Sequence, residues 1–189
     1  MRRAALVLAL ALALLLPGTP TRAQTNTEAA LVLRVLSYDR NLRQRSPGRE
    51  VIVMAVHAAG NSRSERECGA LVAAINQLGR SISVSGMRAR AVTHAWSGAD
   101  ALKRAARAAR ATGIYLCPGF EPDVDVLAQA TRDASLLSIS PRESDVRGGL
   151  TVGIVRDGRR VRLVINVRAA QAEGARLDAA LLRIATVVR

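Results

Sequence analysis

Short apolar runs alternate with helical patterns along most of the chain, and this alternation constrains the fold more than any other feature. Residues 51–56 form a continuous apolar run of strand length, and a helical pattern of apolar residues follows it. The runs at 114–117 and 136–139 flank another helical pattern. Buried strands that alternate with helices build a mainly parallel sheet with helices on both faces. We therefore expect a single-domain layered α/β sandwich.

The remaining patterns complete the expected order of elements. Asp157-Gly158 between two apolar runs predicts an antiparallel hairpin at one edge of the sheet. The expected helices cover residues 25–45, 64–78, 101–111, 122–134 and 169–173, with a last helix capped by Asp178. The expected strands cover residues 51–56, 82–84, 89–95, 114–117, 136–139, 150–155 and 160–167, and residues 140–149 are expected to form a polar loop.

Three helix starts carry capping patterns. Thr25 with Glu28, and Ser64 with Glu67, fit capping boxes, and Ser97 fits an N-cap. The loop before Ser64 also joins a strand to a helix start, where backbone N–H groups can hold an anion. It lacks the Gly-Lys-Ser ending of a P-loop. A loop that only caps the helix and a loop that binds an anion both stay open. The residues of this possible anion loop are Gly60, Asn61, Ser62 and Ser64.

Residues 1–23 have the pattern of a secretory signal peptide. Two arginines precede an unbroken run of Ala, Leu and Val at 4–16, and Thr21-Arg22-Ala23 fits a small-residue cleavage site. The apolar run is shorter than the roughly 20 residues that span a bilayer. We expect cleavage before Gln24, which leaves residues 24–189 as one domain in the periplasm without direct membrane insertion.

The charge of the chain is strongly positive, at +13 over 189 residues, and about +10 once the three arginines of the leader are removed. Aromatic residues make up only 2% of the chain, so it offers no platform on which bases could stack. We therefore expect no nucleic-acid partner. Attraction to an acidic partner surface remains open.

Cys68 and Cys117 are the two cysteines of the chain. Cys68 is expected in the first turn of a helix and Cys117 at the end of a strand, and these places share one edge of a parallel sheet. An oxidising compartment permits a disulfide between them. A permanent structural disulfide, a redox switch, and free or intermolecular thiols all stay open.

Candidate catalytic and metal sites are few. His57 ends an apolar strand, and His94 lies between apolar residues, so both are expected to pack against the core or at its edge. Asp123 and Asp125 are expected to form an acidic helix start rather than a metal site. A Cys68–His57 couple would resemble a nucleophile and its base, but no third group is evident. We expect no enzyme activity, no cofactor and no metal.

The C-terminal third contains short motifs in a characteristic order. After the motif Leu-Leu-Ser-Ile-Ser at 136–140 come a glycine pair, a strand that ends in Ile-Asn, and a closing helix with paired leucines. The glycines permit a sharp turn, the asparagine can bond nearby backbone, and the leucines, with Ile184, are expected to pack the helix onto the sheet. The motif residues are Gly148, Gly149, Asn166, Leu181 and Leu182.

In these motifs, and in the order of its elements, the chain resembles the YfiR-like family of exported regulators. The resemblance implies a non-catalytic periplasmic protein that binds the periplasmic sensor region of an inner-membrane signalling protein. In the best-known relatives that protein is a diguanylate cyclase of cyclic di-GMP signalling, and a sensor kinase is the other candidate. The family also suggests a homodimer.

Two other classes of function stay open besides a regulator. A small-ligand binding protein would use the edge of the sheet where the strands end. A hydrolase or thiol oxidoreductase would need a reactive cysteine, but the chain has no Cys-x-x-Cys motif.

Overall fold

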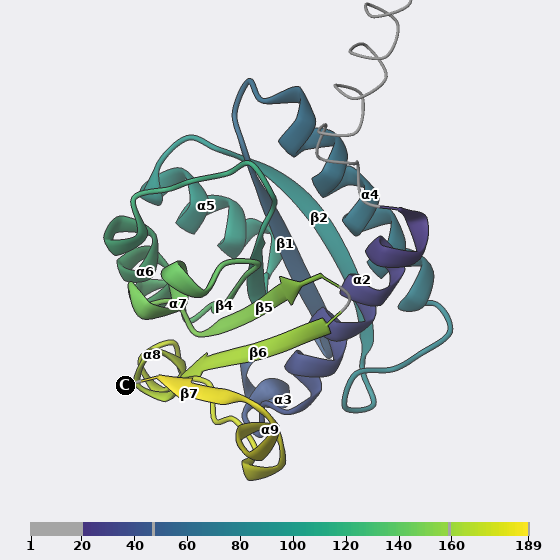
Figure 1. Ribbon diagram of the computed structural model, residues 1–189, viewed down its shortest axis with the longest axis vertical. Coiled ribbons are helices and arrows are strands. Elements are labelled where there is room, and N and C mark those ends of the chain that lie inside the picture. The colour runs from purple at the N-terminus through teal and green to yellow at the C-terminus, as the bar shows by residue number, and fades with distance from the viewer. Residues whose placement is uncertain (1–20, 47, 159, 189) are drawn as a thin grey trace, which may run out of the picture.

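The computed structural model describes residues 21–46, 48–158 and 160–188, and it confirms the expected α/β fold (Figure 1). The expected signal peptide lies outside these residues apart from positions 21–23. One sheet runs in the order β2-β1-β3-β4-β5-β6-β7, and its neighbouring strands are parallel except β5 and β6. The strands are β1 Glu50–Ala58, β2 Arg88–Trp96, β3 Gly113–Leu116, β4 Leu137–Ser140, β5 Val152–Asp157, β6 Arg160–Asn166 and β7 Thr186–Val188.

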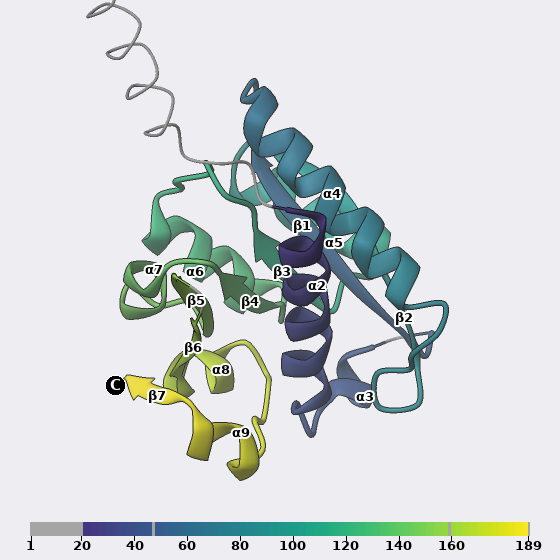
Figure 2. The same cartoon turned by 45° about the vertical axis from the view of Figure 1, so that its right-hand side comes forward.

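Helices cover both faces of the sheet, and Figures 1 and 2 show α2 and α4 side by side across one of them. Strand β1 is buried along its length because alternate residues pack on opposite faces. Val53 and Ala55 belong to the core beneath α2 and α4, whereas Met54 and Val56 belong to the core beneath α5 and α6. The helices are α2 Arg22–Ser37, α3 Leu42–Arg45, α4 Ser62–Leu78, α5 Ala99–Ala109, α6 Val124–Asp133, α7 Glu143–Arg147, α8 Val167–Ala172 and α9 Ala179–Ile184.

The first expected helix, 25–45, is wrong in its length. Helix α2 ends at Ser37, and the short α3 follows. The break lies at Asp39, whose carboxylate turns inward and accepts hydrogen bonds from the backbone N–H groups of Asn41 and Arg176. A buried carboxylate bound to the chain's far end outweighs helix propensity here.

The expected caps are also corrected at three places. Thr21 and Gln24, rather than Thr25 and Glu28, form the capping box of α2. Asn61 caps α4 in place of Ser64, and Gly98 precedes α5 in place of Ser97. The N-caps of α2 and α4 thus lie four and three residues upstream of the expected ones, because Thr21 and Asn61 take the N-cap positions, whereas that of α5 lies one residue downstream of Ser97.

The strand expected at residues 82–84 is wrong. Val84 and Met87 exchange two backbone hydrogen bonds, of 2.9 and 3.0 Å, around a two-residue turn. Ser85 and Gly86 both have positive φ angles, of 51° and 77°, as a type I′ turn requires. The segment is therefore a tight turn between α4 and β2.

The C-terminal region holds two elements that the sequence patterns do not predict. Residues 143–147 form α7 inside the expected polar loop, and Thr186–Val188 form β7, parallel to β6 outside the hairpin. The expected inward packing of Ile184 is wrong, because its side chain is 68% exposed. Leu181 is buried and Leu182 is half-buried.

Candidate functional site

The carboxyl ends of β1 and β3 form the point where the chain changes direction across the sheet. Helix α4 connects β1 to β2 over one face, and α5 returns to β3 over the other. In open parallel sheets, the crevice outside such a pair of strands is the usual place for a ligand. The loops that follow β1 and β3 are therefore the first place to look for a site.

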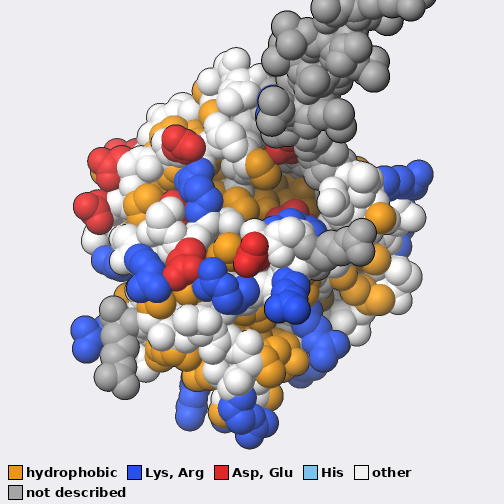
Figure 3. Space-filling view, in the orientation of Figure 1, with side chains coloured by type: hydrophobic (Ala, Val, Ile, Leu, Met, Phe, Trp, Pro, Cys, Tyr) orange, Lys and Arg blue, Asp and Glu red, His pale blue; other side chains and the backbone are white. Residues whose placement is uncertain are grey.

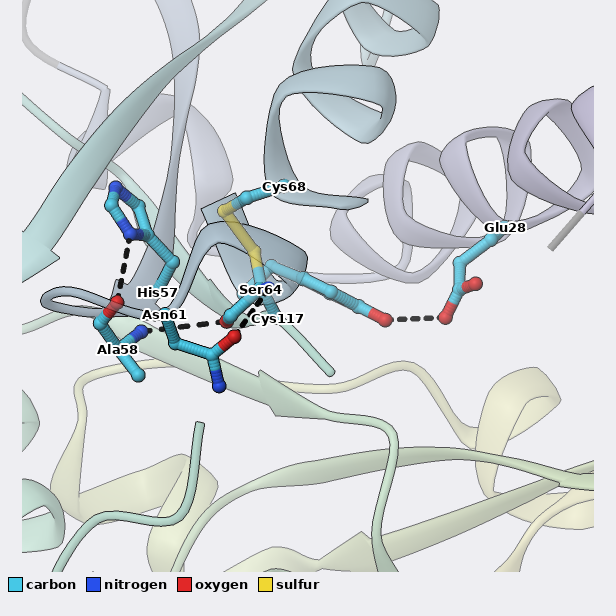
Figure 4. Close-up of a disulfide and its surroundings, with 8 residues drawn as sticks. Glu28, His57, Ala58, Asn61, Ser64, Cys68 and Cys117 are labelled. Atoms are coloured by element: carbon cyan, nitrogen blue, oxygen red, sulfur yellow. Dashed lines mark hydrogen bonds between the residues drawn. A yellow bond between two sulfur atoms is a disulfide. The ribbon is translucent and has the colours of Figure 1, made fainter. Parts of the chain in front are cut away.

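A disulfide closes this crevice. Cys68, from α4, is bonded to Cys117, which follows β3, with 5.4 Å between their Cα atoms (Figure 4). This confirms the expected pairing at the carboxyl edge of the sheet, but Cys68 lies in the second turn of α4 and not in the expected first, because the helix begins at Ser62. Both cysteines are buried, at 0% and 1% exposure. Their sulfur atoms therefore face the core under α4 instead of solvent.

The possible anion loop has the hydrogen bonds of a closed helix cap. The side-chain oxygen of Asn61 accepts from the backbone N–H groups of Arg63 and Ser64, each at 3.1 Å. The Asn61 amide also donates to the Gly119 carbonyl at 3.3 Å, which joins the loops after β1 and β3. The Ser64 hydroxyl accepts from the Ala58 N–H (Figure 4). Some of the N–H groups that an anion in this loop would need thus already donate to side chains of the loop. Anion binding at Gly60, Ser62 and their neighbours stays a prediction.

The two histidines lie on opposite faces of the sheet and form no couple with a nucleophile. His57 is 8% exposed, and its Nδ1 lies 3.3 Å from the Ala58 carbonyl. Cys68 is bonded to Cys117, so a Cys68–His57 nucleophile is not formed. Burial, and to a lesser extent His57, lower the pKa of His94, which favours a neutral imidazole.

A buried tyrosine connects β3 to the N-terminal helix. The Tyr115 hydroxyl donates a hydrogen bond to Glu28 of α2 (Figure 4). Burial, followed by the nearby Glu28 carboxylate, raises the pKa of Tyr115 well above its ordinary value. The tyrosine therefore stays neutral and acts as a donor that holds α2 on the sheet.

An ion pair beside the carboxyl end of β4 is absent from the sequence-based predictions. Asp145 of α7 accepts from the Ser140 hydroxyl at 2.5 Å and pairs with Arg142 at 2.9 Å. Arg142 also donates to the Phe120 carbonyl at 2.8 Å. The group fastens the loop after β3 to the loop after β4. The Arg-x-x-Asp spacing was visible in the sequence, but only the fold brings Phe120 to it.

The glycine pair and Asn166 meet at α7. Gly149 has a φ of 117°, whereas Gly148 has an ordinary φ of −78° and is needed for space, since a Cβ there would lie 2.8 Å from Val124 Cγ1. Asn166 caps α8 by accepting from the Ala169 N–H, and it donates to the Val146 carbonyl. These motif residues shape the backbone around the end of α7.

The acidic helix start at Asp123 behaves as a cap. Its carboxylate accepts from the backbone N–H groups of Asp125 and Val126.

Within residues 21–46, 48–158 and 160–188, no group of three or more His, Cys, Asp or Glu side chains is placed to hold a metal ion. The polar groups at the carboxyl edge described above bind each other and the backbone, so their arrangement fixes the loops there.

Comparison with known proteins agrees with the resemblance seen in the sequence. A family model described as YfiR/HmsC-like matches residues 25–186. No curated protein matches the sequence.

Two solved structures show the same kind of fold. A conserved domain protein from Vibrio cholerae O1 biovar El Tor has a TM-score of 0.59 at 14% identity, over 87% of this chain and 60% of that one. The ABC domain from Streptococcus pneumoniae in complex with L-Trp has a TM-score of 0.56 at 10% identity, over 82% of this chain and 62% of that one. The chain thus spans about 60% of the length of either structure, and at these identities the likeness shows the fold alone.

Proposed function

The chain belongs to the YfiR/HmsC-like family, and from this membership we propose that it is a non-catalytic periplasmic regulator. Its proposed partner is the periplasmic sensor region of an inner-membrane signalling protein, either a diguanylate cyclase or a sensor kinase, whose output it modulates. The observation that carries the proposal is the family match over residues 25–186, nearly the whole of the expected mature chain.

The signal-peptide pattern at residues 1–23 supports a periplasmic place of action. We propose that residues 1–23 are a cleaved signal peptide and that residues 24–189 are the mature domain. Among the described residues, the structure contains no helix with the length and apolar character needed to cross a bilayer. In this proposal the partner supplies the connection to the membrane.

The hydrogen bonds at the carboxyl edge are consistent with a binding protein rather than an enzyme. Cys68 and Cys117 are joined in a disulfide, and Asn61 joins the loops that follow β1 and β3. These two cysteines and Asn61 thus hold the scaffold together.

Capture from membranes tests the proposal. The tagged mature protein is added to detergent-solubilised inner membranes of its host, fixed with a short crosslinker, and purified, with a tagged unrelated periplasmic protein as the control. We expect a transmembrane protein with a periplasmic sensor region and a cytoplasmic cyclase or kinase domain. Recovery of soluble proteins alone would contradict the proposal.

A small-ligand binding protein is the alternative. It is favoured by the likeness to a structure that contains L-Trp, although that ligand belongs to the other protein. The closed crevice between β1 and β3 speaks against it. A thermal-shift screen with amino acids and other metabolites separates the two functions, because a ligand that binds the folded state raises the melting temperature.

A further inference from the structure

The amino edge of the sheet, opposite the disulfide, carries a long depression. A hollow of about 980 Å³ lies between the end of α4 and the start of β2. It shares Ile82 and Ser83 with a second hollow of about 440 Å³, which in turn shares Ser37 and Tyr38 with a third of about 420 Å³. We call these three adjoining hollows together the amino-edge groove. Its lining includes Arg34, Tyr38, Arg43, Arg80, Ile82 and Arg88.

One wall of the groove is held in place before any partner binds. The turn between α4 and β2 is anchored by Val84 and Met87, which are 2% and 5% exposed. Arg43 of α3 donates to the Ser85 carbonyl at 3.3 Å. Figure 2 shows the connection from α4 to β2 lying beside α3. A preformed wall lowers the entropy that a partner must lose on binding.

The groove follows β2, the outermost strand, but the backbone of β2 is already covered there. Asn76 accepts from the Ala91 N–H at 2.8 Å and donates to the Ala91 carbonyl at 3.2 Å, as a neighbouring strand would. Gly79 lies so close to Ala89 that a Cβ would meet its carbonyl oxygen at 1.9 Å. Strand addition is therefore blocked at these positions, and a partner in the groove must be recognised by side chains.

The charge of the groove is unbalanced. Each acidic residue in its lining is already paired with an arginine: Glu50 with Arg90, Asp178 with Arg40, and Asp39 with Arg45. Four further arginines of the lining form no ion pair within the described part of the chain. They are Arg34, Arg43, Arg80 and Arg88, and all four are exposed.

The arginines of the hairpin region differ from those of the groove. Arg147 and Arg162 share Glu143, at 2.6 and 2.7 Å, and Arg156 lies 3.9 Å from Glu28. On the face in Figure 3, basic and acidic side chains accordingly lie next to one another. Within the described part of the chain, arginines without an ion pair also occur elsewhere, among them Arg104 and Arg107 of α5, but these line none of the three hollows. What distinguishes the groove is that four such arginines line one surface with apolar residues beside them.

We propose that the amino-edge groove binds an extended acidic segment of a partner protein. Its carboxylates would pair with the four arginines, and its apolar side chains would contact Ile82, which is 43% exposed, and Tyr38. A small anion would occupy one hollow, whereas only a chain reaches all three. This inference rests on the proposed function, because it places the docking surface for the sensor region at this groove.

Fluorescence anisotropy with the mature protein tests the groove directly. The probe is a short fluorescein-labelled peptide in which Glu alternates with Ala and Leu, and its twin has Gln at every Glu. The groove variant is Arg80→Glu with Arg88→Glu. The matched control is Arg104→Glu with Arg107→Glu, which makes the same charge change at exposed positions of α5, on the other face of the sheet.

We expect the acidic peptide to bind and the Gln twin to bind at least about tenfold more weakly. The groove variant should weaken the peptide complex by about tenfold or more, because attraction becomes repulsion at two positions, and the control variant by less than about threefold. Equal losses in the two variants, or equal binding of the twin, would overturn the proposal. So would tighter, groove-dependent binding of a single-stranded oligonucleotide, which would assign the arginines to phosphates.

Membrane capture with the same variants separates this inference from the proposed function. Loss of the membrane partner in the groove variant, but not in the control, supports both. Capture by the groove variant at the wild-type level overturns the groove as the docking surface and leaves the proposed function standing. Groove-dependent peptide binding without capture of a membrane protein by the wild type contradicts the proposed function and leaves the groove as an acidic-segment site.

Discussion

At the scale of single residues, the least expected group is the carboxylate of Glu173. It is fully buried and accepts hydrogen bonds from the hydroxyls of Thr131, Ser138 and Thr151, at 2.7, 2.6 and 2.5 Å, and from the Ser138 N–H at 2.9 Å. It thus fixes α8 to α6, β4 and the residue before β5. Burial raises its pKa, and the hydrogen bonds from Ser138, Thr151 and Thr131 oppose that rise.

This shift makes stability depend on pH. The folded-state pKa lies above the ordinary value of 4.5, so the protonated form favours folding, and that contribution is lost as the pH rises through the folded-state pKa. We expect the unfolding free energy of the wild type, relative to Glu173→Gln, to be largest below pH 4.5 and to fall above it, by at most about 1.4 kcal/mol per pH unit. Urea unfolding of both proteins across pH measures this. A difference that stays constant or rises with pH would contradict it.

The disulfide belongs to the same scale. Cys68→Ala with Cys117→Ala opens a loop of 49 residues, and we expect the unfolding free energy to fall by up to about 4 kcal/mol. Urea unfolding measures the change. Reducing agent should destabilise the wild type and leave the double variant unaffected. Unchanged stability of the double variant would exclude a structural disulfide, and native-state reduction that changes partner capture would favour a redox switch.

At the scale of elements, a buried ion pair holds the connection between α2 and α3 against the sheet. Arg45 pairs with Asp39 at 2.6 Å and donates to the carbonyls of Thr112 and Ser135. Both side chains of the pair are at most 8% exposed. The pair replaces the helical turn that apolar periodicity predicts, and it fastens α3 to the loops that precede β3 and β4.

Removing one partner of this pair should lower the unfolding free energy strongly. Asp39→Ala leaves Arg45 buried without its carboxylate, and we expect a loss of about 3–5 kcal/mol in unfolding free energy. Arg40→Ala is the matched control, because Arg40 is 55% exposed in its pair with Asp178, and such pairs contribute little. Similar unfolding midpoints for the two variants would show that the buried pair is not a major source of stability.

At the scale of the whole molecule, the two edges of the sheet have different roles. At the carboxyl edge, the disulfide and Asn61 close the crevice between β1 and β3. The amino edge carries an open groove with unpaired arginines. The proposed regulator would thus be stabilised at one edge and bind its partner at the other.

The proposed signal peptide sets where the mature protein should begin. We expect the protein recovered from the periplasmic fraction to start at Gln24, which intact mass measurement can establish. Cleavage there removes Thr21 and the capping box of α2, while the buried residues from Ala29 to Leu36 keep the rest of the helix on the core. A periplasmic protein that retains residues 1–23 would contradict the signal peptide.

The sequence by itself determined the layered α/β architecture and the place of the two cysteines at one edge of the sheet, while the bond between them is seen only in the structure. Buried parallel strands such as β1 are apolar on both faces, and Asp157-Gly158 permits the tight hairpin. Both features can therefore be predicted from residues that are close in sequence. The place of Cys117 followed from the rule that strand ends and helix starts share one edge.

Only the tertiary structure decided the rest. The inward turn of Asp39, the burial of Glu173 and the covering of the β2 edge by Asn76 each depend on a group distant in sequence or placed by the packing of another element. The amino-edge groove has the same origin, because α2, α3 and the turn before β2 come together there. Periodicity records which face of an element is apolar, but it does not record which polar groups meet when the elements pack.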